Sequence, residues 1–208
     1  MNTPQRTFIF IGPSGCGKGT QVKLLQNYLR EQDPTCEIFY HQSGNYFREF
    51  VKGATYAADI SRNALNNGER QPDFLAMWIW SNTFIENLHG HEHLIIDGSP
   101  RSLNEQQNLD IALKFFKRTQ PTVIYMQVSH DWALERMLGR AKEEGRADDT
   151  KEAIEKRLAW YESDVLPVVE HYRRDRDYDF VEINGEQTIE AVYQEIIKKV
   201  FTEIREVL

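Results

Sequence analysis

Five short segments rich in β-branched and aromatic residues alternate with longer segments of helical periodicity along this chain. The strand-like segments are residues 7–11, 37–41, 93–97, 122–128 and 178–183. Apolar positions three or four residues apart predict helices over 19–30, 103–116, 130–140, 150–172 and 187–207. Strands that alternate with helices indicate an α/β fold, in which a five-stranded parallel sheet carries helices on both faces. Such sheets bind ligands at the carboxyl ends of their strands.

Two intervals interrupt this alternation. Between the second and third strands, residues 43–51, 55–67 and 73–88 read as three helices, which predicts a helical insertion in a βα crossover. A short polar stretch follows Arg140 and ends before Asp148. Since no repeat, low-complexity segment or linker divides the chain, we expect a single domain.

The first apolar segment leads directly into a glycine-rich turn. Gly12, four further residues and then Gly17-Lys18 form the spacing of a phosphate-binding P-loop, with the required strand before it and helix after it. Glycines let successive backbone N–H groups point at an anion, and a lysine and a helix N-terminus add positive charge. We therefore expect a P-loop NTPase-like fold that binds a nucleotide triphosphate through residues Gly12, Pro13, Ser14, Gly15, Cys16, Gly17, Lys18, Gly19 and Thr20.

A second phosphate-site pattern follows the third apolar segment. Asp97 ends this strand and precedes Gly98 and Arg101. An acidic residue at a strand end beside a P-loop is typical of a Mg²⁺ site, here through metal-bound water. Arg101 then turns back over the strand ends.

Further arginines follow in the second half of the chain. Arg136 and Arg140 lie four residues apart on one predicted helix face, Arg146 precedes two aspartates, and Arg157 lies in the next helix. A single such arginine is usually a solvated surface residue. Together with the P-loop and Asp97 they suit phosphoryl transfer, which needs fixed positive charge and reactants held in line.

Composition limits the partners. The 208 residues carry a formal net charge of -7, which argues against a general nucleic-acid or membrane-surface binder. The two cysteines, Cys16 and Cys36, form no disulfide framework, and we see neither a secretory leader nor an apolar run of about 18 residues. We expect a cytoplasmic monomer without nucleic-acid or membrane partners.

These motifs, in this order, resemble those of the adenylate kinases and of nucleoside monophosphate (NMP) kinases more broadly. The resemblance covers nearly the whole chain and includes the segment 43–48, Ser-Gly-Asn-Tyr-Phe-Arg. It implies a single kinase domain with a core of residues 1–41, 72–139 and 149–208, an NMP-binding insertion at 42–71, and a short lid at 140–148. The lid has no cysteine cluster, so no structural zinc is expected.

The resemblance also implies residue roles. The catalytic residues would be Lys18, Arg101, Arg136, Arg140, Arg146 and Arg157, of which the last four are called the lid-side arginines. Arg136, Arg140 and Gln187 would join the P-loop in binding ATP. Asp97 would hold Mg²⁺ through water. The acceptor nucleotide would be bound by Ser43, Gly44, Arg48, Gln71, Gly98, Arg101, Glu105, Arg146 and Arg157.

Three acceptor-side residues depart from the family pattern. Asn45 replaces a usual aspartate, Gln71 a usual aliphatic residue, and Glu105 a usual glutamine. A glutamine amide can both accept and donate at the adenine edge, whereas an ionised carboxylate only accepts, which suits the two adjacent donors of guanine. AMP is the favoured acceptor, with GMP or a pyrimidine monophosphate (UMP or CMP) as alternatives.

The expected reaction is therefore ATP + AMP = 2 ADP, with Mg²⁺ as cofactor. Two other readings stay open at this stage. A P-loop hydrolase would not need a second phosphate site, and a catalytically weak nucleotide sensor would not need the full set of cations. His89, His91 and His93 alternate within one loop, but without a second cluster at ligand spacing we interpret them as a solvated loop rather than a metal site.

Overall fold

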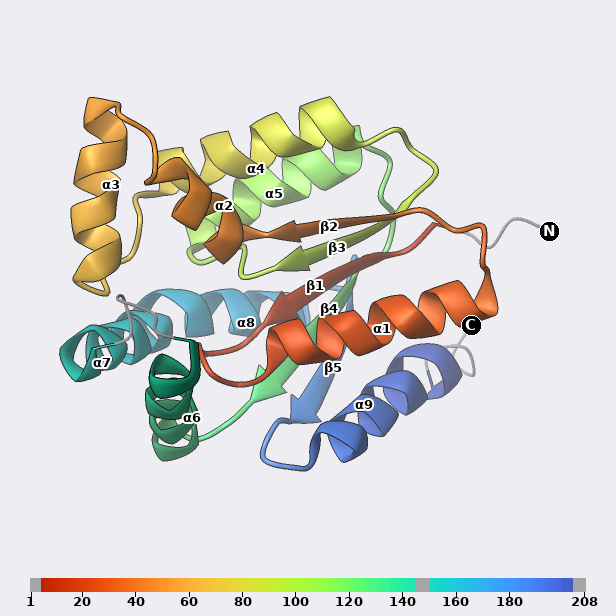
Figure 1. The fold of residues 1–208 in the computed structure, drawn as a ribbon. Helices are drawn as coiled ribbons and strands as arrows, with labels where there is room; N and C mark the ends of the chain where they lie inside the picture. The colour runs from red at the N-terminus through yellow and green to blue at the C-terminus, as the bar shows by residue number, and fades with distance from the viewer. Residues whose placement is uncertain (1–4, 145–149, 204–208) are drawn as a thin grey trace.

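The computed structural model describes residues 5–144 and 150–203. Its centre is a five-stranded sheet with the strand order β2-β3-β1-β4-β5, in which every neighbouring pair is parallel. The α/β architecture expected from the alternating pattern is confirmed (Figure 1). The strands are β1 (Thr7–Ile11), β2 (Ile38–Gln42), β3 (His93–Asp97), β4 (Thr122–Gln127) and β5 (Asp179–Asn184).

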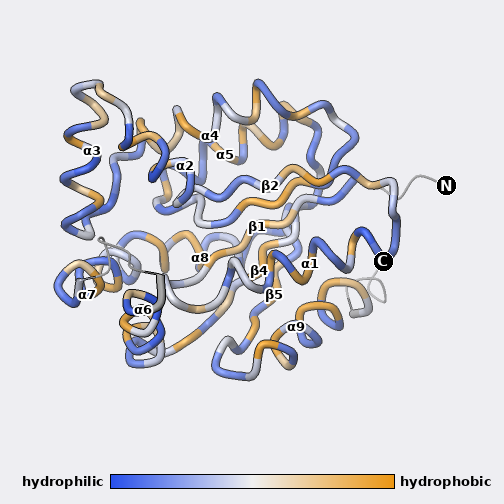
Figure 2. The backbone as a smooth tube through the Cα atoms, in the orientation of Figure 1, coloured by the Kyte–Doolittle hydropathy of each residue, from blue (hydrophilic) through white to orange (hydrophobic). Residues whose placement is uncertain are grey.

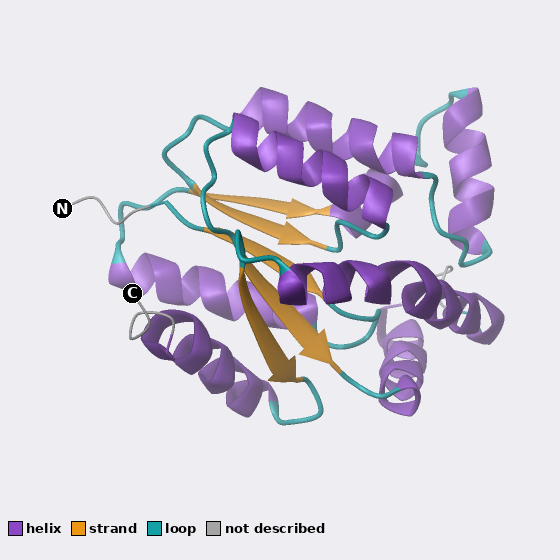
Figure 3. Ribbon diagram, turned by 180° about the vertical axis from the view of Figure 1, so that it is seen from behind, coloured by secondary structure: helices purple, strands orange, loops and turns teal. Residues whose placement is uncertain are grey.

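Helices cover both faces of this sheet, and β1 supplies side chains to both cores. Phe8 and Phe10 pack with Leu25 on the face of α1 and α9, while Ile9 and Ile11 pack on the opposite face with α4, α5 and α8. Figure 2 shows hydrophobic residues along the strands, and Figure 3 shows the strands between the two groups of helices. These helices are α1 (Lys18–Gln32), α4 (Asp73–Asn87), α5 (Leu103–Phe115), α8 (Leu166–Arg174) and α9 (Ile189–Ile197).

The strand order brings the two phosphate-site motifs together. β1 pairs with β3 so that Phe10 lies opposite Asp97, and the P-loop begins two residues after Phe10, at Gly12. β2 and β3 lie on one side of β1 in the sheet, and β4 and β5 lie on the other, so the strand order reverses at β1. Open α/β sheets form their ligand crevice at such a reversal.

The remaining helices stand around this carboxyl edge. α2 (Ser43–Phe50) and α3 (Tyr56–Asn66) follow β2, and α3 stands clear of the sheet (Figure 1). α6 (His130–Glu144) and α7 (Lys151–Trp160) lie below them in the same view. The two groups touch, because Trp160 Nε1 donates to the Gly68 carbonyl at 3.0 Å and Arg70 Nε lies 2.7 Å from Asp164 Oδ2. Helix α6 extends into the stretch predicted as a lid, whose residues 145–148 lie outside the described part.

The long helix predicted over 150–172 is interrupted. A π-helical turn, η1 (Tyr161–Val165), separates α7 from α8, and Pro167 lies in the first turn of α8. Proline has no N–H to continue the helical ladder, and a wider turn accommodates its ring. Similarly, the last predicted helix begins at Ile189, capped by the Thr188 hydroxyl, and changes into a second π-helix, η2 (Lys198–Glu203). None of the described helices has both the length and the apolar character needed to cross a membrane.

At the opposite end of the sheet, a buried ion pair holds the loop before β3. Glu92 and Arg118 are paired with only 3% and 4% of their side chains exposed. Arg118 also donates to the Glu92 carbonyl at 2.7 Å, and the Glu92 carboxylate accepts the N–H groups of His89, Gly90 and His91. Burial raises the pKa of Glu92, but these N–H groups and the arginine outweigh it and leave that pKa below its ordinary value.

We predict that Glu92→Gln lowers the free energy of unfolding by about 3–5 kcal/mol, because a buried guanidinium loses its counter-charge. Urea denaturation at pH 7 measures it. Since the folded-state pKa is depressed, the stabilisation by Glu92 is present above its unfolded pKa and is lost as the pH falls through the folded one. The difference in the free energy of unfolding between the variant and the wild type should therefore become smaller at acidic pH.

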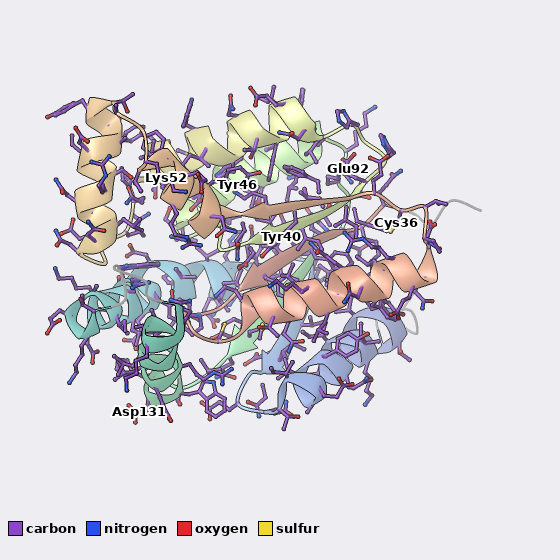
Figure 4. The ribbon with its side chains drawn as sticks, viewed as in Figure 1. Cys36, Tyr40, Tyr46, Lys52, Glu92 and Asp131 are labelled. Atoms are coloured by element: carbon purple, nitrogen blue, oxygen red, sulfur yellow. The ribbon has the colours of Figure 1, made fainter. Side chains whose placement is uncertain are left out.

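The matched control is Glu49→Gln, which breaks a pair with Lys52 whose side chains are 70% and 68% exposed. It should change stability by less than about 1 kcal/mol. Figure 4 shows Lys52 and Glu92 at opposite ends of the molecule. Equal effects of the two substitutions would contradict the structural role given to Glu92.

Candidate active site

One large cavity of about 930 Å³ opens at the carboxyl edge of the sheet, between the P-loop, the segment after β3, and the helices α2, α3, α6 and α7. This volume lies near the upper end of the range of about 300–1,000 Å³ for small-molecule sites. Most of the residues predicted for the site line it: Gly12, Ser14, Gly15, Gly17, Lys18, Gly19, Thr20, Gly44, Arg48, Gln71, Asp97, Gly98, Arg101, Arg136, Arg140 and Arg157.

The P-loop has the geometry of an anion cradle. Gly15 and Gly17 have φ angles of 87° and 93°, in the left-handed region that favours glycine. A Cβ on Gly15 would also lie 2.8 Å from the Ala133 carbonyl oxygen, so this turn lies directly against α6. Lys18 begins α1, and its ammonium donates to the carbonyls of Gly12 and Pro13 at 2.8 and 2.9 Å. The lysine charge is therefore held across the loop by neutral acceptors that a phosphate could replace.

Asp97 is fixed by two neutral donors from β2. Its Oδ2 accepts the Tyr40 hydroxyl at 2.9 Å and the Gln42 amide at 3.1 Å. Burial and the nearby Asp97 raise the pKa of Tyr40, so the phenol stays a proton donor to the carboxylate. Figure 4 shows Tyr40 on the strand beside this edge. An oriented carboxylate with further lone pairs available suits the water-mediated Mg²⁺ site predicted here.

A chain of side-chain hydrogen bonds joins Asp97 to Arg48. Gln42 donates to Asp97 and accepts from the Asn45 amide, and Asn45 in turn accepts from the Arg48 guanidinium. Asn45 is one of the three departures noted above. An ionised aspartate could accept from Arg48 but could not donate to Gln42. This network therefore explains why an asparagine suits position 45.

Gln71, the second departure, is tied to the insertion. Its Oε1 accepts the Ser61 hydroxyl at 2.8 Å, and its Nε2 donates to the Ser61 carbonyl at 3.0 Å. Both groups are buried, so this paired contact satisfies the amide where an aliphatic residue is usual. It anchors α3 against the segment that precedes α4.

Glu105, the third departure, does not line the cavity. Its side chain is 1% exposed, and its Oε2 accepts the Arg101 backbone N–H at 2.6 Å. Its own N–H donates to the Ser102 hydroxyl at 3.1 Å, so the two residues form a variant of the capping box at the start of α5. Burial raises the pKa of Glu105. In the structure Glu105 therefore contacts the backbone of Arg101, and its contact with the acceptor base stays a prediction.

Arg101 itself reaches the cavity. Its Nε donates to the Gly98 carbonyl at 2.6 Å, and its guanidinium carbon lies 5.6 Å from the centroid of the Trp160 ring. Burial lowers its pKa, although Glu105 and Asp97 act in the opposite direction. Trp160 was not singled out from the sequence; nothing in its position along a helix distinguishes it from a core tryptophan.

The other arginines line the opposite wall. Arg136 and Arg140 project from one face of α6, Arg157 projects from α7, and the Arg136 guanidinium lies 6.0 Å from the Trp132 ring. Arg146 lies outside the described residues. Among the described residues, the cavity wall carries three acidic side chains (Glu69, Asp97, Glu135) and seven cationic ones: Lys18, Lys23, Arg48, Arg101, Arg136, Arg140 and Arg157. This positive edge belongs to a protein of net charge -7.

Besides Glu105, four predicted residues within the described part do not line the cavity, namely Pro13, Cys16, Ser43 and Gln187. Gln187 donates to Asn184 and Glu195 in the turn after β5. Sequence reasoning missed Tyr40, Gln42 and Lys23, all of which line the site. The first two could have been found, because they alternate at the carboxyl end of a strand and so point to one side.

His89 and His91 lie in the loop before β3, whereas His93 is the first residue of that strand. His93 is buried and its Nδ1 accepts the Arg6 backbone N–H at 3.0 Å, while His91 lies 3.1 Å from Glu37. The interpretation as a solvated loop is therefore wrong for His93, while His89 and His91 are exposed and their ring centroids lie 6.0 Å apart.

Comparison with known proteins supports the same assignment. Residues 10–177 match the family model "Adenylate kinase". The adenylate kinase of Bacteroides fragilis is 29% identical over 93% of this chain and 97% of its own length. Adenylate kinase 1 of a Nostoc species is 31% identical over 90% and 95%, and the adenylate kinase of Leptospira biflexa is 29% identical over 94% and 100%. The chain therefore belongs to the adenylate kinase family, the ATP:AMP phosphotransferases among the nucleoside monophosphate kinases.

Proposed function

We propose that this protein carries out the family reaction, reversible transfer of the ATP γ-phosphoryl group to AMP, within the single cavity at the carboxyl edge of its sheet. The observation that carries the proposal is the arrangement of that cavity. The P-loop forms one part of its wall, Arg48 and Arg101 form another, and Arg136, Arg140 and Arg157 complete it. Such a site suits two anionic ligands that meet at their phosphates.

The residues have distinct roles in this proposal. The P-loop, residues 12–20, and Lys18 bind the donor phosphates, and Gln187 contributes beside them. Arg48 and Arg101 bind the acceptor phosphate, with Ser43, Gly44, Gln71 and Gly98 shaping its surroundings. The lid-side arginines stabilise the phosphoryl group during its transfer, and Arg146 is included among them because of the family resemblance.

The chemistry requires positioning and charge rather than a base. An oxygen of the acceptor phosphate attacks the γ-phosphorus in line, and the bond from that phosphorus to the β–γ bridging oxygen breaks, which leaves two diphosphates. The acceptor oxygen is already anionic, so no proton has to be removed from it. Fixed cations stabilise charge on the transferred group most strongly where water is excluded.

We propose Mg²⁺ as the cofactor, held through water by Asp97. When bound with ATP, it would neutralise charge on the phosphates. The fit rests on a buried carboxylate that Tyr40 and Gln42 orient with neutral donors. We also propose a cytoplasmic monomer without nucleic-acid or membrane partners, consistent with the net charge of -7.

Family membership favours AMP over the alternative acceptors GMP, UMP and CMP, and it favours catalysis over sensing. A hydrolase would use ATP without any monophosphate. A sensor would bind nucleotides without forming diphosphates.

Arg101→Ala should lower kcat by a factor on the order of 10³, because the transferred charge loses a fixed cation. A coupled assay of ADP formation from ATP and AMP measures it. The control is Arg174→Ala, which removes an arginine whose side chain is 80% exposed and which does not line the cavity. Turnover of the Arg101 variant within a few-fold of wild type would refute its role.

Asp97→Asn should raise the Mg²⁺ concentration needed for half-maximal rate, or lower the rate, by about 10–100-fold, the usual effect of losing an outer contact to a metal. Initial rates across a Mg²⁺ series at fixed ATP and AMP measure the effect. Asp131→Asn serves as control, since this aspartate is fully exposed on α6 (Figure 4). An unchanged Mg²⁺ dependence in the Asp97 variant would contradict the assignment.

Glu105→Gln distinguishes a helix-capping role from direct contact with the acceptor base. Because the carboxylate binds the Arg101 N–H and glutamine can also occupy a capping box, we expect the ratio of kcat/KM for AMP to that for GMP to change less than about tenfold. The assay compares AMP, GMP, CMP, UMP and dTMP for both proteins. A larger rise in AMP preference would show that Glu105 reads the base after all.

A further inference from the structure

A group of potential metal ligands lies outside the nucleotide cavity. Asp110 projects from α5, and His171 projects from the last turn of α8. Asp175 is the C-cap residue that follows α8. One ligand atom from each lies within 4.8 Å of the others, and in the part of the chain that the structure describes this is the only such group of three. His171 Nε2 already lies 3.5 Å from Asp175 Oδ2.

Other residues orient both carboxylates. The Tyr178 hydroxyl donates to Asp110 Oδ1 at 2.5 Å, and the Gln106 amide donates to Asp110 Oδ2. On Asp175, Oδ1 accepts the backbone N–H of Asp177 at 2.9 Å, which leaves Oδ2 directed toward His171. Metal-ligating carboxylates typically have such outer hydrogen bonds, which fix their orientation.

The charged groups around the site are of both signs. Lys114, Lys117, Arg118 and Arg176 line the neighbouring cavity together with Asp110 and Asp177. Arg118 is paired with Glu92, and Lys114 Nζ lies 4.0 Å from Asp177 Oδ2. On α8, Arg173 pairs with Glu170 and Glu182.

A cavity of about 540 Å³ next to the group is lined in part by Asp110 and Tyr178, but His171 and Asp175 do not line it. His171 is itself exposed, so an ion can reach the group from solvent.

We propose that Asp110, His171 and Asp175 bind one divalent transition-metal ion of the Zn²⁺, Co²⁺ or Ni²⁺ class. One imidazole and two carboxylates suit these ions, whereas Mg²⁺ prefers oxygen ligands alone. Bonds of about 2.0–2.2 Å require the three groups to approach one another slightly, and the His171 side chain, which is 42% exposed, has room to move. Water completes the coordination.

The bound ion would join α5 to α8. Helix α5 begins just after Arg101, and α8 follows α7, which carries Arg157, so the ion would stabilise the framework behind two cavity arginines. It would take no part in phosphoryl transfer. This site is separate from the lid, for which the prediction of no structural zinc rests on the missing cysteines.

The test uses the full chain after removal of metals with EDTA. Isothermal titration with Co²⁺, followed also by visible absorbance, should give one site in the wild type, and Co²⁺ should raise the thermal midpoint. His171→Asn should weaken that binding by about tenfold or more and remove the thermal shift. Asp110→Asn should act in the same direction, while turnover with Mg²⁺ stays unchanged for His171→Asn.

The matched control is His91→Asn, which removes another exposed histidine that lies 3.1 Å from a glutamate; its Co²⁺ binding should equal that of the wild type. The thermal midpoint without metal checks that each variant folds, and His171, being exposed, is the decisive position. The proposal is overturned if the wild type binds no Co²⁺, if His171→Asn binds as the wild type does, or if His91→Asn removes the site.

Discussion

Positive charge concentrated at one edge of an acidic protein is the constraint on which the site depends. Seven cationic side chains among the described residues face one cavity, and like charges so close repel one another. Neutral groups hold several of them in place: Lys18 donates to two loop carbonyls, Arg101 to the Gly98 carbonyl, and Arg48 to the Asn45 amide. A neutral acceptor positions a cation without cancelling its charge, so the field remains available to phosphates.

The sheet makes this concentration possible. Because β1 lies between β3 and β4, the P-loop, Asp97 and the start of α6 all leave the sheet at the same edge. Two apolar cores, one on each face, stabilise that framework with side chains that take no part in chemistry. The contacts of Trp160 with Gly68 and of Arg70 with Asp164 then bring the insertion against η1 and α7. The cations on the two walls thus come from segments far apart in the chain.

Much of this was predictable from sequence, and the failures have physical causes. β1 and β3 match their predicted bounds because dense apolar runs end at Gly12 and Asp97, which mark the exits of both strands. The interruption of the helix at η1 was missed because the periodicity continues across Pro167. The role of Glu105 at the start of α5 was missed, although its spacing from Ser102 is that of a capping box and could have been read from the chain. The Asp110, His171 and Asp175 group could not be read from the chain, since only folding brings α5 to α8.

The central claim is that one chain holds two nucleotides together, with their phosphates facing the same set of cations. Equilibrium dialysis with labelled ADP and Mg²⁺ tests it most directly, because counting label is insensitive to interconversion of ADP with ATP and AMP. The account predicts that binding saturates at two adenine nucleotides per chain. Saturation at one nucleotide per chain would contradict it.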